Sequence, residues 1–386
     1  MQFKEIPGLS DLKSALIQSV KRSHVSHSQL FYSAEGGAQL AMAFAYATYI
    51  NCENRQETDS CGACASCHKM AKIAHPDFHQ VFAIPSKTAK EKGGGDSDKK
   101  GSTIDDYVPL WRTFLQKNIY QSLADWHEHI GAEKNKQAAI SAEEARKIIQ
   151  KVSLKAYEAE YKILIVWLPE LMNSSAANAI LKVLEEPPAK TLFLMVSNDP
   201  NKLLPTILSR TILVNIPLFE DNNIVNYLVY NNIAENTRAK QVAYLAEGNL
   251  SKAIEIVNQA DEGLHENFAV WMRLCFKPDI AGLIKQADQF ALQSKTAQKQ
   301  LLEYGLSMFR DIFLWINGGQ KLIRLEGDEL QFVERFGKVV NPDSLEFITN
   351  EMSETSYHLE RNANAKILFL DLSLRIVKVI KLNKQG

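Results

Sequence analysis

Four of the five cysteines lie close together in the sequence, at Cys52, Cys61, Cys64 and Cys67. Four thiolates can surround one tetrahedral ion, and the two C-x-x-C steps bring neighbouring sulfurs to a common centre. We therefore predict a closed, structural Zn²⁺ site with no open position for catalysis. An iron–sulfur cluster and redox-active or incidental cysteines are the alternatives. Cys275 stands apart from the cluster.

Three histidines, His68, His75 and His79, follow the cysteine cluster. One of them could replace a sulfur as a ligand, although four thiols already suffice for a tetrahedral ion. The run His75-Pro76-Asp77 is better explained as the start of a strand.

A second stretch has the position of a phosphate-binding loop but not its chemistry. Residues 33–40 lie between an expected strand and an expected helix, where a working loop reads G-x-x-x-x-G-K-[ST]. Gln39 stands in place of the lysine that holds the phosphate oxygens, and Leu40 in place of the Mg²⁺-binding hydroxyl. With Ser33 and Ala38 in the same degenerate loop, the sequence predicts that this chain binds no ATP.

The acidic residues of a nucleotide-hydrolysing site are missing as well. The expected strand 162–167 ends in Trp167-Leu168, where an ATPase carries an Asp for Mg²⁺ and a Glu to position water. Glu170 follows two residues later, but without the lysine we give it little weight. We predict no catalytic site in this chain, and a divergent ATPase is the alternative.

Arg210 follows Ser209 and precedes an expected strand at 211–216. An arginine at the edge of an α/β domain that lacks a phosphate site of its own could serve a site on a neighbouring chain. The residues by themselves favour a simpler interpretation, a surface or salt-bridged arginine.

The elements that position these residues alternate between strand and helix. Apolar runs predict strands at 30–32, 162–167, 191–196 and 211–216. The last three are expected to be buried on both faces, which is typical of a mostly parallel sheet. Helices are expected at 38–50, at 175–186 and after Ser141, where Glu144 completes a capping-box pattern. Ser10 is expected to cap the first helix.

An insertion of about residues 86–137 interrupts this alternation. Its first part, 86–103, is rich in Lys, Asp and Gly, and we expect it to be flexible. Trp111, Phe114 and Trp126 then recur at helical intervals. We expect this aromatic stripe to pack on its own domain, and a docking face for a partner is the alternative.

Composition sets limits on the class of protein. The 386 residues carry 44 Lys and Arg against 45 Asp and Glu, a net charge of −1. This balance argues against a chain that grips nucleic acid along its whole length. The first 30 residues lack a signal-peptide pattern, and the apolar stretch 40–50 is far shorter than the roughly 20 residues of a membrane span. We expect a cytoplasmic protein with no membrane partner.

Several strings together resemble one family. They are H-S-Q-L-F at 27–31, the cysteine cluster, His75-Pro76-Asp77, L-K-V-L-E-E-P-P at 181–188, and the run 199–210 that ends in Ser209-Arg210. The chain resembles the bacterial DNA polymerase III clamp-loader subunits over about residues 5–85 and 138–260. The C-terminal part of the chain resembles that family only in its helical pattern, without matching motifs.

This resemblance implies a fold and three domains. We expect an AAA+ α/β domain at 1–217, which includes the cysteine module 52–67 and the insertion. A small helical lid at 218–262 and an all-α collar at 263–386 should follow.

The resemblance also implies a function. In that family the tau/gamma subunit keeps the phosphate loop and hydrolyses ATP, whereas the delta-prime branch has lost it, and the altered loop places this chain with delta-prime. The family's arginine finger corresponds to Arg210, although Thr211 replaces the cysteine that usually follows. Such a finger acts in trans on the ATP of an adjacent subunit.

The implied partners are the other members of a hetero-oligomeric clamp loader. They are the tau/gamma and delta subunits, with the sliding clamp and primer-template DNA reached through the complex. A free-standing zinc protein that binds DNA is the remaining alternative, but only Arg55, Lys69 and Lys72 flank the cysteines.

Overall fold

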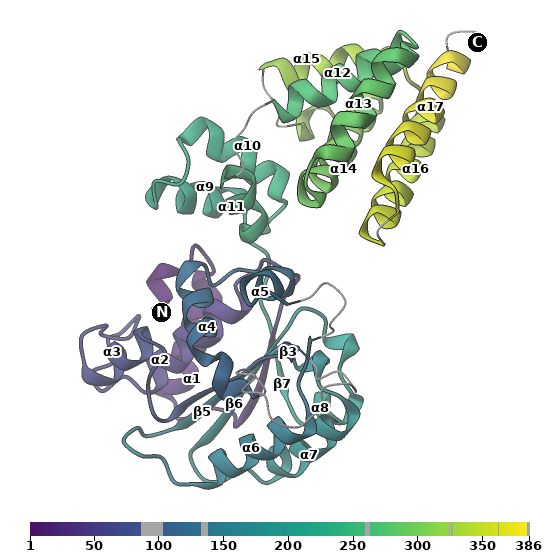
Figure 1. Ribbon diagram of the computed structural model, residues 1–386. Helices are drawn as coiled ribbons and strands as arrows, with labels where there is room; N and C mark the ends of the chain where they lie inside the picture. Colours follow the sequence, from purple (N-terminus) through teal and green to yellow (C-terminus); the bar gives the residue numbers. More distant parts are fainter. Residues whose placement is uncertain are drawn as a thin grey trace, which may run out of the picture. The chain divides into compact units, whose positions relative to one another are not determined.

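The computed structural model describes residues 1–85, 103–132, 138–258, 263–323, 325, 327–361 and 363–383. It divides into two compact units, Met1–Glu255 and Ile256–Gly386, and each is considered by itself (Figure 1). The segment 86–102, which we expected to be flexible, lies outside the described residues. The division into domains at 217 and 262 remains a prediction.

A five-stranded parallel sheet forms the centre of the first unit, in the order β2-β5-β6-β1-β7. Every residue of β5 and β6 is buried, as the apolar runs predict for strands covered on both faces. The bounds are β1 (Ser28–Tyr32), β2 (Phe78–Val81), β5 (Lys162–Trp167), β6 (Thr191–Ser197) and β7 (Ile212–Asn215).

The strand β7 differs from the expectation of a third buried strand. It forms the edge of the sheet and pairs with β1. Ile212 and Leu213 are 56% and 51% exposed. The apolar run predicted a strand correctly, but its burial depends on the strand's place in the sheet, and the prediction of burial was wrong.

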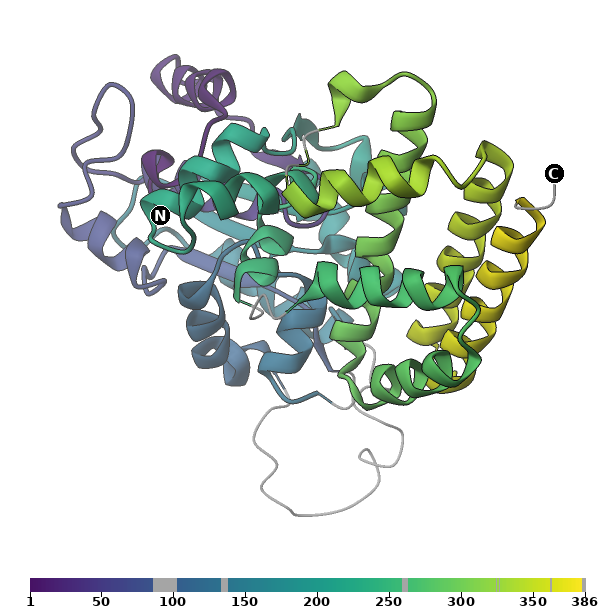
Figure 2. The ribbon, with the colours of Figure 1, turned by 90° about the horizontal axis from the view of Figure 1, so that it is seen from above.

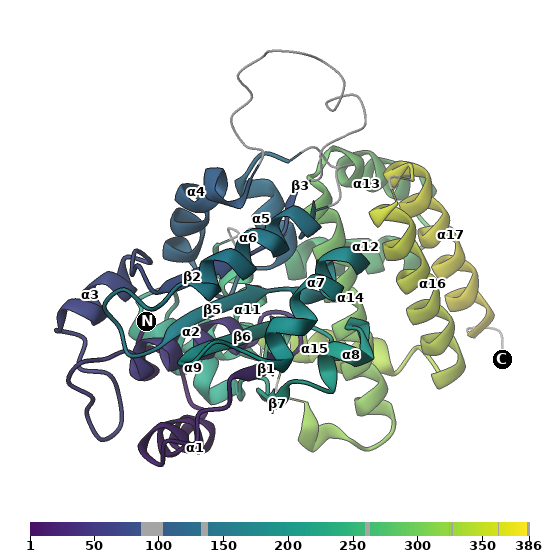
Figure 3. The ribbon, with the colours of Figure 1, turned by 90° about the horizontal axis from the view of Figure 1, so that it is seen from below.

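Helices cover both faces of this sheet (Figures 1 and 3). The chain moves across the sheet in one direction after β1 and in the other after β2, β5 and β6. Right-handed crossovers therefore put α2 on one face and α6 to α8 on the other. The helices are α1 (Ser10–Lys21), α2 (Gln39–Ile50), α3 (Ala65–Ala71), α4 (Ile104–Lys117), α5 (Leu123–His129), α6 (Ala142–Ser153), α7 (Ser174–Glu185) and α8 (Pro205–Leu208).

Two predicted helix starts have different outcomes. The start at Ser141 is confirmed, because its Oγ accepts a hydrogen bond from the backbone N–H of Glu144 at 3.3 Å. Ser10 is not the cap of α1. It is the first helical residue, and Leu9 occupies the cap position with φ +57°.

The described part of the insertion packs on its own domain. The rings of Trp111 and Trp167 lie 5.0 Å apart, and Trp111 also meets Trp126 at 5.2 Å and Phe114 at 5.5 Å. All four side chains are buried. A short antiparallel pair, β3 (Ile84–Pro85) with β4 (Ala138–Ala139), joins the two ends of the insertion. The expected packing of the aromatic stripe is confirmed.

After β7 the chain is helical, as predicted. The helices are α9 (Asp221–Tyr230), α10 (Asn236–Ala246) and α11 (Leu250–Asn258). Tyr120 of the insertion is buried edge-on against the rings of Phe219 and Tyr227, at 5.7 and 5.9 Å. The insertion therefore joins the α/β part to the first of these helices.

The described residues of the second unit form helices joined by short turns, with no strand among them. Its helices are α12 (Leu264–Phe276), α13 (Ile280–Leu292), α14 (Lys295–Ile316), α15 (Gly327–Gly337), α16 (Pro342–Glu360) and α17 (Ala365–Asn383). The helices α16 and α17 lie side by side (Figures 1 and 2). Trp271 is buried and donates from Nε1 to Ser373 Oγ at 2.8 Å. Across the ranges that the structure describes, no helix is long and apolar enough to cross a membrane.

Candidate functional site: a closed phosphate loop, a surface arginine and a four-cysteine cluster

The loop between β1 and α2 follows the course of a phosphate-binding loop. The strand β1 ends at Tyr32, and α2 begins at Gln39. Gly36 has φ +79°, and a Cβ there would lie 1.8 Å from Asn249 Oδ1, so the position needs glycine. Backbone N–H groups at such a helix start can receive an anion. Whether an anion can reach these N–H groups depends on the side chains around the loop.

Gln39 turns its amide back into the loop. Its Nε2 donates to the Ala34 carbonyl at 3.3 Å and to Asn198 Oδ1 at 2.9 Å. Gln39 is 5% exposed, and its Oε1 and the Ser33 hydroxyl are buried with no hydrogen-bond partner among the described residues. A Cβ on Gly37 would meet Ser33 Oγ at 2.3 Å. The chain's own side chains therefore fill the space beside the loop.

The start of α11 covers the same loop. The backbone N–H of Leu250 donates to the Gly36 carbonyl at 3.1 Å. The Asn249 side chain lies against Gly36, and its Oδ1 accepts from the backbone N–H of Lys252 at 2.8 Å. The other two positions of the altered loop, Ala38 and Leu40, are buried and apolar.

The end of β5 carries an aromatic side chain where an acidic pair would be needed. Trp167 is buried in the aromatic cluster with Trp111. Glu170 Oε1 accepts from the backbone N–H of Asn198 at 3.1 Å, and burial raises the pKa of Glu170. Gln39, Asn198 and Glu170 are thus joined by hydrogen bonds, at the place where a hydrolytic site would hold phosphate and metal.

Arg210 lies on the surface directly after α8, and its side chain is 32% exposed. Its Nε donates to Glu185 Oε1 at 2.7 Å, and Nη2 forms an ion pair with the same oxygen. Its Nη1 donates to the Thr206 carbonyl at 2.8 Å and to Ser209 Oγ at 3.1 Å. These partners belong to α7 and to the arginine's own segment, so the structure does not bring Arg210 to the altered loop.

The four sulfurs of Cys52, Cys61, Cys64 and Cys67 gather in one place. Their Sγ atoms all lie within 4.8 Å of one another, and Cys61 and Cys67 are 3.9 Å apart. A tetrahedral ion with Zn–S bonds of about 2.3 Å places its sulfurs roughly 3.8 Å apart. The donor set and its spacing therefore fit one tetrahedral metal ion.

Backbone hydrogen bonds in this cluster favour the ionised, thiolate form of Cys61. The N–H groups of Ala63 and Cys64 donate to Cys61 Sγ at 3.5 and 3.3 Å, and they lower the pKa of that thiol to about 6. The Cys67 N–H donates to Cys64 Sγ at 3.4 Å. Burial raises the pKa of Cys52 and Cys67. A cation at the centre would offset the cost of ionising those two buried thiols.

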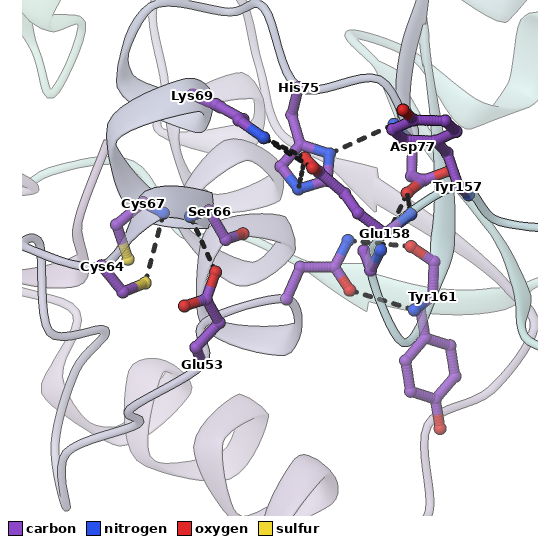
Figure 4. A network of polar contacts seen from close by, with 12 residues as sticks. Glu53, Cys64, Ser66, Cys67, Lys69, His75, Asp77, Tyr157, Glu158 and Tyr161 are labelled. Carbon is purple, nitrogen blue, oxygen red and sulfur yellow. Dashed lines mark hydrogen bonds and ion pairs between the residues drawn. The ribbon is translucent and has the colours of Figure 1, made fainter.

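A polar network connects α3 of the cysteine module to the sheet (Figure 4). Glu158 accepts from Lys69 Nζ at 2.6 and 2.7 Å and lies 3.5 Å from His75 Nε2. Asp77 accepts the N–H groups of residues 157–159 at 2.5 to 2.9 Å. Burial opposes ionisation of Asp77, but these three donors hold its pKa below the ordinary value. His75 precedes β2 as expected and belongs to this network.

Sequence reasoning missed three of these contacts. Glu185 belongs to the L-E-E-P-P string, but nothing in the string shows that it faces Arg210. Asn198 and Asn249 lie 159 and 210 positions after Gln39, and only the folded chain brings them to the altered loop.

The chain is similar to known proteins. Residues 8–220 match the family described as DNA polymerase III, delta subunit. Over 194 residues the chain is 30% identical to DNA polymerase III subunit delta' of Yersinia pestis, covering 50% of this chain and 41% of that protein. Over 263 residues it is 23% identical to DNA polymerase III subunit tau of Escherichia coli strain K12, covering 67% of this chain and 33% of that protein.

These alignments leave much of each relative unmatched. The chain spans less than half the length of the two curated relatives. Among solved structures, a DNA polymerase III gamma subunit-related protein from Thermotoga maritima aligns over 96% of this chain and 100% of that chain. Its identity is 13% and its TM-score 0.39.

Proposed function

This chain belongs to the family described as DNA polymerase III, delta subunit, and on that premise we propose that it is a non-ATP-binding, delta-prime-type subunit of a clamp loader. It acts as a stator and carries no catalytic site of its own. It contributes an arginine to the ATP site of a neighbouring subunit during sliding-clamp loading in DNA replication.

The closed interior of the altered loop carries this proposal. A neutral amide, Gln39, stands where a lysine would neutralise phosphate charge, and its N–H donors are directed to Ala34 and Asn198. Binding of ATP would have to break these hydrogen bonds. Leu40 also provides no hydroxyl to bind the Mg²⁺ that accompanies ATP. Nucleotide binding is therefore unfavourable at both the phosphate and the metal position.

The contacts around the loop support a fixed subunit. Leu250 is hydrogen-bonded to Gly36, and Tyr120 packs against Phe219 and Tyr227. None of these contacts uses a nucleotide. The helix α9 and the start of α11 can therefore keep one position against the sheet through the ATP cycle of a neighbour, as a lid that does not move.

Arg210 is the proposed finger. Its planar, cationic guanidinium suits the equatorial oxygens of a transferring phosphoryl group. It lies beside the exposed apolar residues Ile212 and Leu213 of the edge strand β7. An adjacent ATPase subunit would cover this surface and bring its ATP to the arginine.

The cysteine cluster holds one Zn²⁺ in this proposal. The ligands are Cys52, Cys61, Cys64 and Cys67, and the ion has a structural role, because four thiolates leave no open position. It ties the ends of the excursion between α2 and β2 together.

The partners follow from the same premise. The chain assembles with tau/gamma and delta subunits in a hetero-oligomer, through its α/β edge and through the all-helical collar at 263–386. It meets the sliding clamp and primer-template DNA as part of that complex, in the cytoplasm.

Equilibrium binding of labelled ATP with Mg²⁺ tests the first part of the proposal. The isolated chain should show no saturable binding at micromolar ATP. Micromolar affinity would contradict the proposal and favour a divergent ATPase. The clamp-loader ATPase subunit of the same cell, measured in parallel, is the positive control.

Arg210→Ala in the reconstituted complex tests the finger. An arginine finger contributes about 10³- to 10⁵-fold to kcat at one site, so the site that faces this chain should become silent in single-turnover ATP hydrolysis. Lys202→Ala, a change of a nearby exposed cation, is the matched control. Clamp- and DNA-stimulated hydrolysis at the wild-type level would exclude the finger.

A further inference from the structure

We propose that Glu185 is a positioning residue for Arg210, holding its guanidinium in the orientation that meets the neighbour's phosphate. This inference rests on the proposed role of Arg210 as a finger. Glu185 is the last residue of α7, and Arg210 follows α8, so the contact joins two separate elements.

The geometry restrains the guanidinium from two sides. One edge, Nε and Nη2, faces the Glu185 carboxylate. The other nitrogen, Nη1, faces both the Thr206 carbonyl and Ser209 Oγ. Arginine has five N–H donors in a rigid plane, so these contacts fix the plane and leave one Nη2 donor unassigned.

This arrangement suits a finger better than a free arginine would. An unrestrained arginine samples many rotamers, and ordering it at the moment of reaction costs entropy. A guanidinium that is already oriented avoids this cost, which is how preorganised groups stabilise a transition state. The Arg210 side chain is 32% exposed, so a neighbouring subunit could bring a phosphate oxygen to the unassigned Nη2 donor.

The contact has little value for the stability of the lone chain. Arg210 and Glu185 are 32% and 47% exposed, and ion pairs at such exposure contribute little to folding. The position of Glu185 beside Arg210 is therefore better explained by orientation of the arginine than by a contribution to folding stability. A substitution at Glu185 should leave the chain folded.

Glu185→Gln in the reconstituted complex tests the inference. It keeps the size and one acceptor oxygen but removes the charge. Glu186→Gln changes the exposed neighbour and is the matched control. We expect Glu185→Gln to lower kcat of single-turnover hydrolysis at the facing site at least about threefold, with the ATP affinity of the neighbour unchanged. Glu185→Asp should recover part of the loss.

The double variant Glu185→Gln/Arg210→Ala separates the two proposals. If Glu185 acts through Arg210, the double variant equals Arg210→Ala alone. If Arg210→Ala is active and the finger fails, the proposed function is wrong. If Arg210→Ala is silent while Glu185→Gln equals Glu186→Gln or exceeds wild type, the positioning role of Glu185 is wrong.

Discussion

The side-chain amide of Gln39 donates a hydrogen bond to Asn198 Oδ1 at 2.9 Å, so the residue in the lysine position of the loop is tied to the end of β6. The Asn198 backbone N–H in turn donates to Glu170 Oε1 at 3.1 Å. Hydrogen bonds thus join Gln39, Asn198 and Glu170 where a nucleotide-hydrolysing site would hold phosphate and metal. The altered loop is an organised structural feature.

Restoring the lysine should not restore ATP binding. Gln39→Lys places an ammonium at a position that is 5% exposed and removes the hydrogen bond to Asn198. Loss of this bond and burial of a charge should lower the free energy of unfolding by about 1–3 kcal/mol. Urea denaturation measures the stability, and calorimetric titration with MgATP measures binding. Saturable micromolar binding by Gln39→Lys would show that the loop was only one residue from function.

Metal analysis should find about one equivalent of zinc in the purified chain. Cys64→Ser removes one ligand and should lower the zinc content well below one equivalent, because structural Zn²⁺ prefers four closed ligands. Cys275→Ser is the matched control, since Cys275 is buried in α12, within the other compact unit. Equal zinc content in the two variants, or none in the wild-type chain, would contradict the four-cysteine site.

Acidification should destabilise the α/β unit through His79. Burial, with Lys151 and Lys162 nearby and only partly opposed by Asp77 and Asp105, lowers the pKa of His79 to about 4. An unfolded histidine has a pKa of about 6.5, so the unfolded chain binds more protons between these values. The free energy of unfolding therefore falls as the pH drops from 6.5 to 4, by up to about 1.4 kcal/mol per pH unit.

The variant His79→Gln checks this pH dependence. Its urea midpoint should fall less between pH 7 and pH 5 than that of the wild-type chain. His24→Gln, a change of an exposed histidine, should follow the wild type. Both variants keep the cysteine cluster, so loss of a bound metal at low pH affects them equally. Parallel profiles for all three proteins would exclude His79 as the cause.

Two substitutions at Tyr120 should differ sharply in their effect on stability. The ring is buried between Phe219 and Tyr227, so Tyr120→Ala should cost about 3–5 kcal/mol of unfolding free energy. Its hydroxyl is buried and has no hydrogen-bond partner among the described residues. Tyr120→Phe should therefore be neutral or stabilising by up to about 1 kcal/mol. Thermal unfolding would disprove this account if Tyr120→Phe were as unstable as Tyr120→Ala.

Much of the fold could be predicted from local pattern. The apolar runs at β5 and β6 predict strands and Ser141 predicts a helix start, because strand preference and helix capping depend on neighbours in sequence. The exposure of β7 could not be predicted this way. Its residues are as apolar as those of β6, and only its place at the edge of the sheet leaves Ile212 and Leu213 exposed.

The residue types alone show which chemical groups are present: four thiols at metal-binding spacing, a loop with Gln39 instead of lysine, and an arginine after Ser209. The partners of these groups follow from the packing of the folded chain. This packing directs the Gln39 amide to Asn198 and the Arg210 guanidinium to Glu185, pairs separated by 159 and 25 positions. The chemistry of a side chain is fixed by its residue type. Its contacts with residues far away in the chain form only when the sheet and its helices pack.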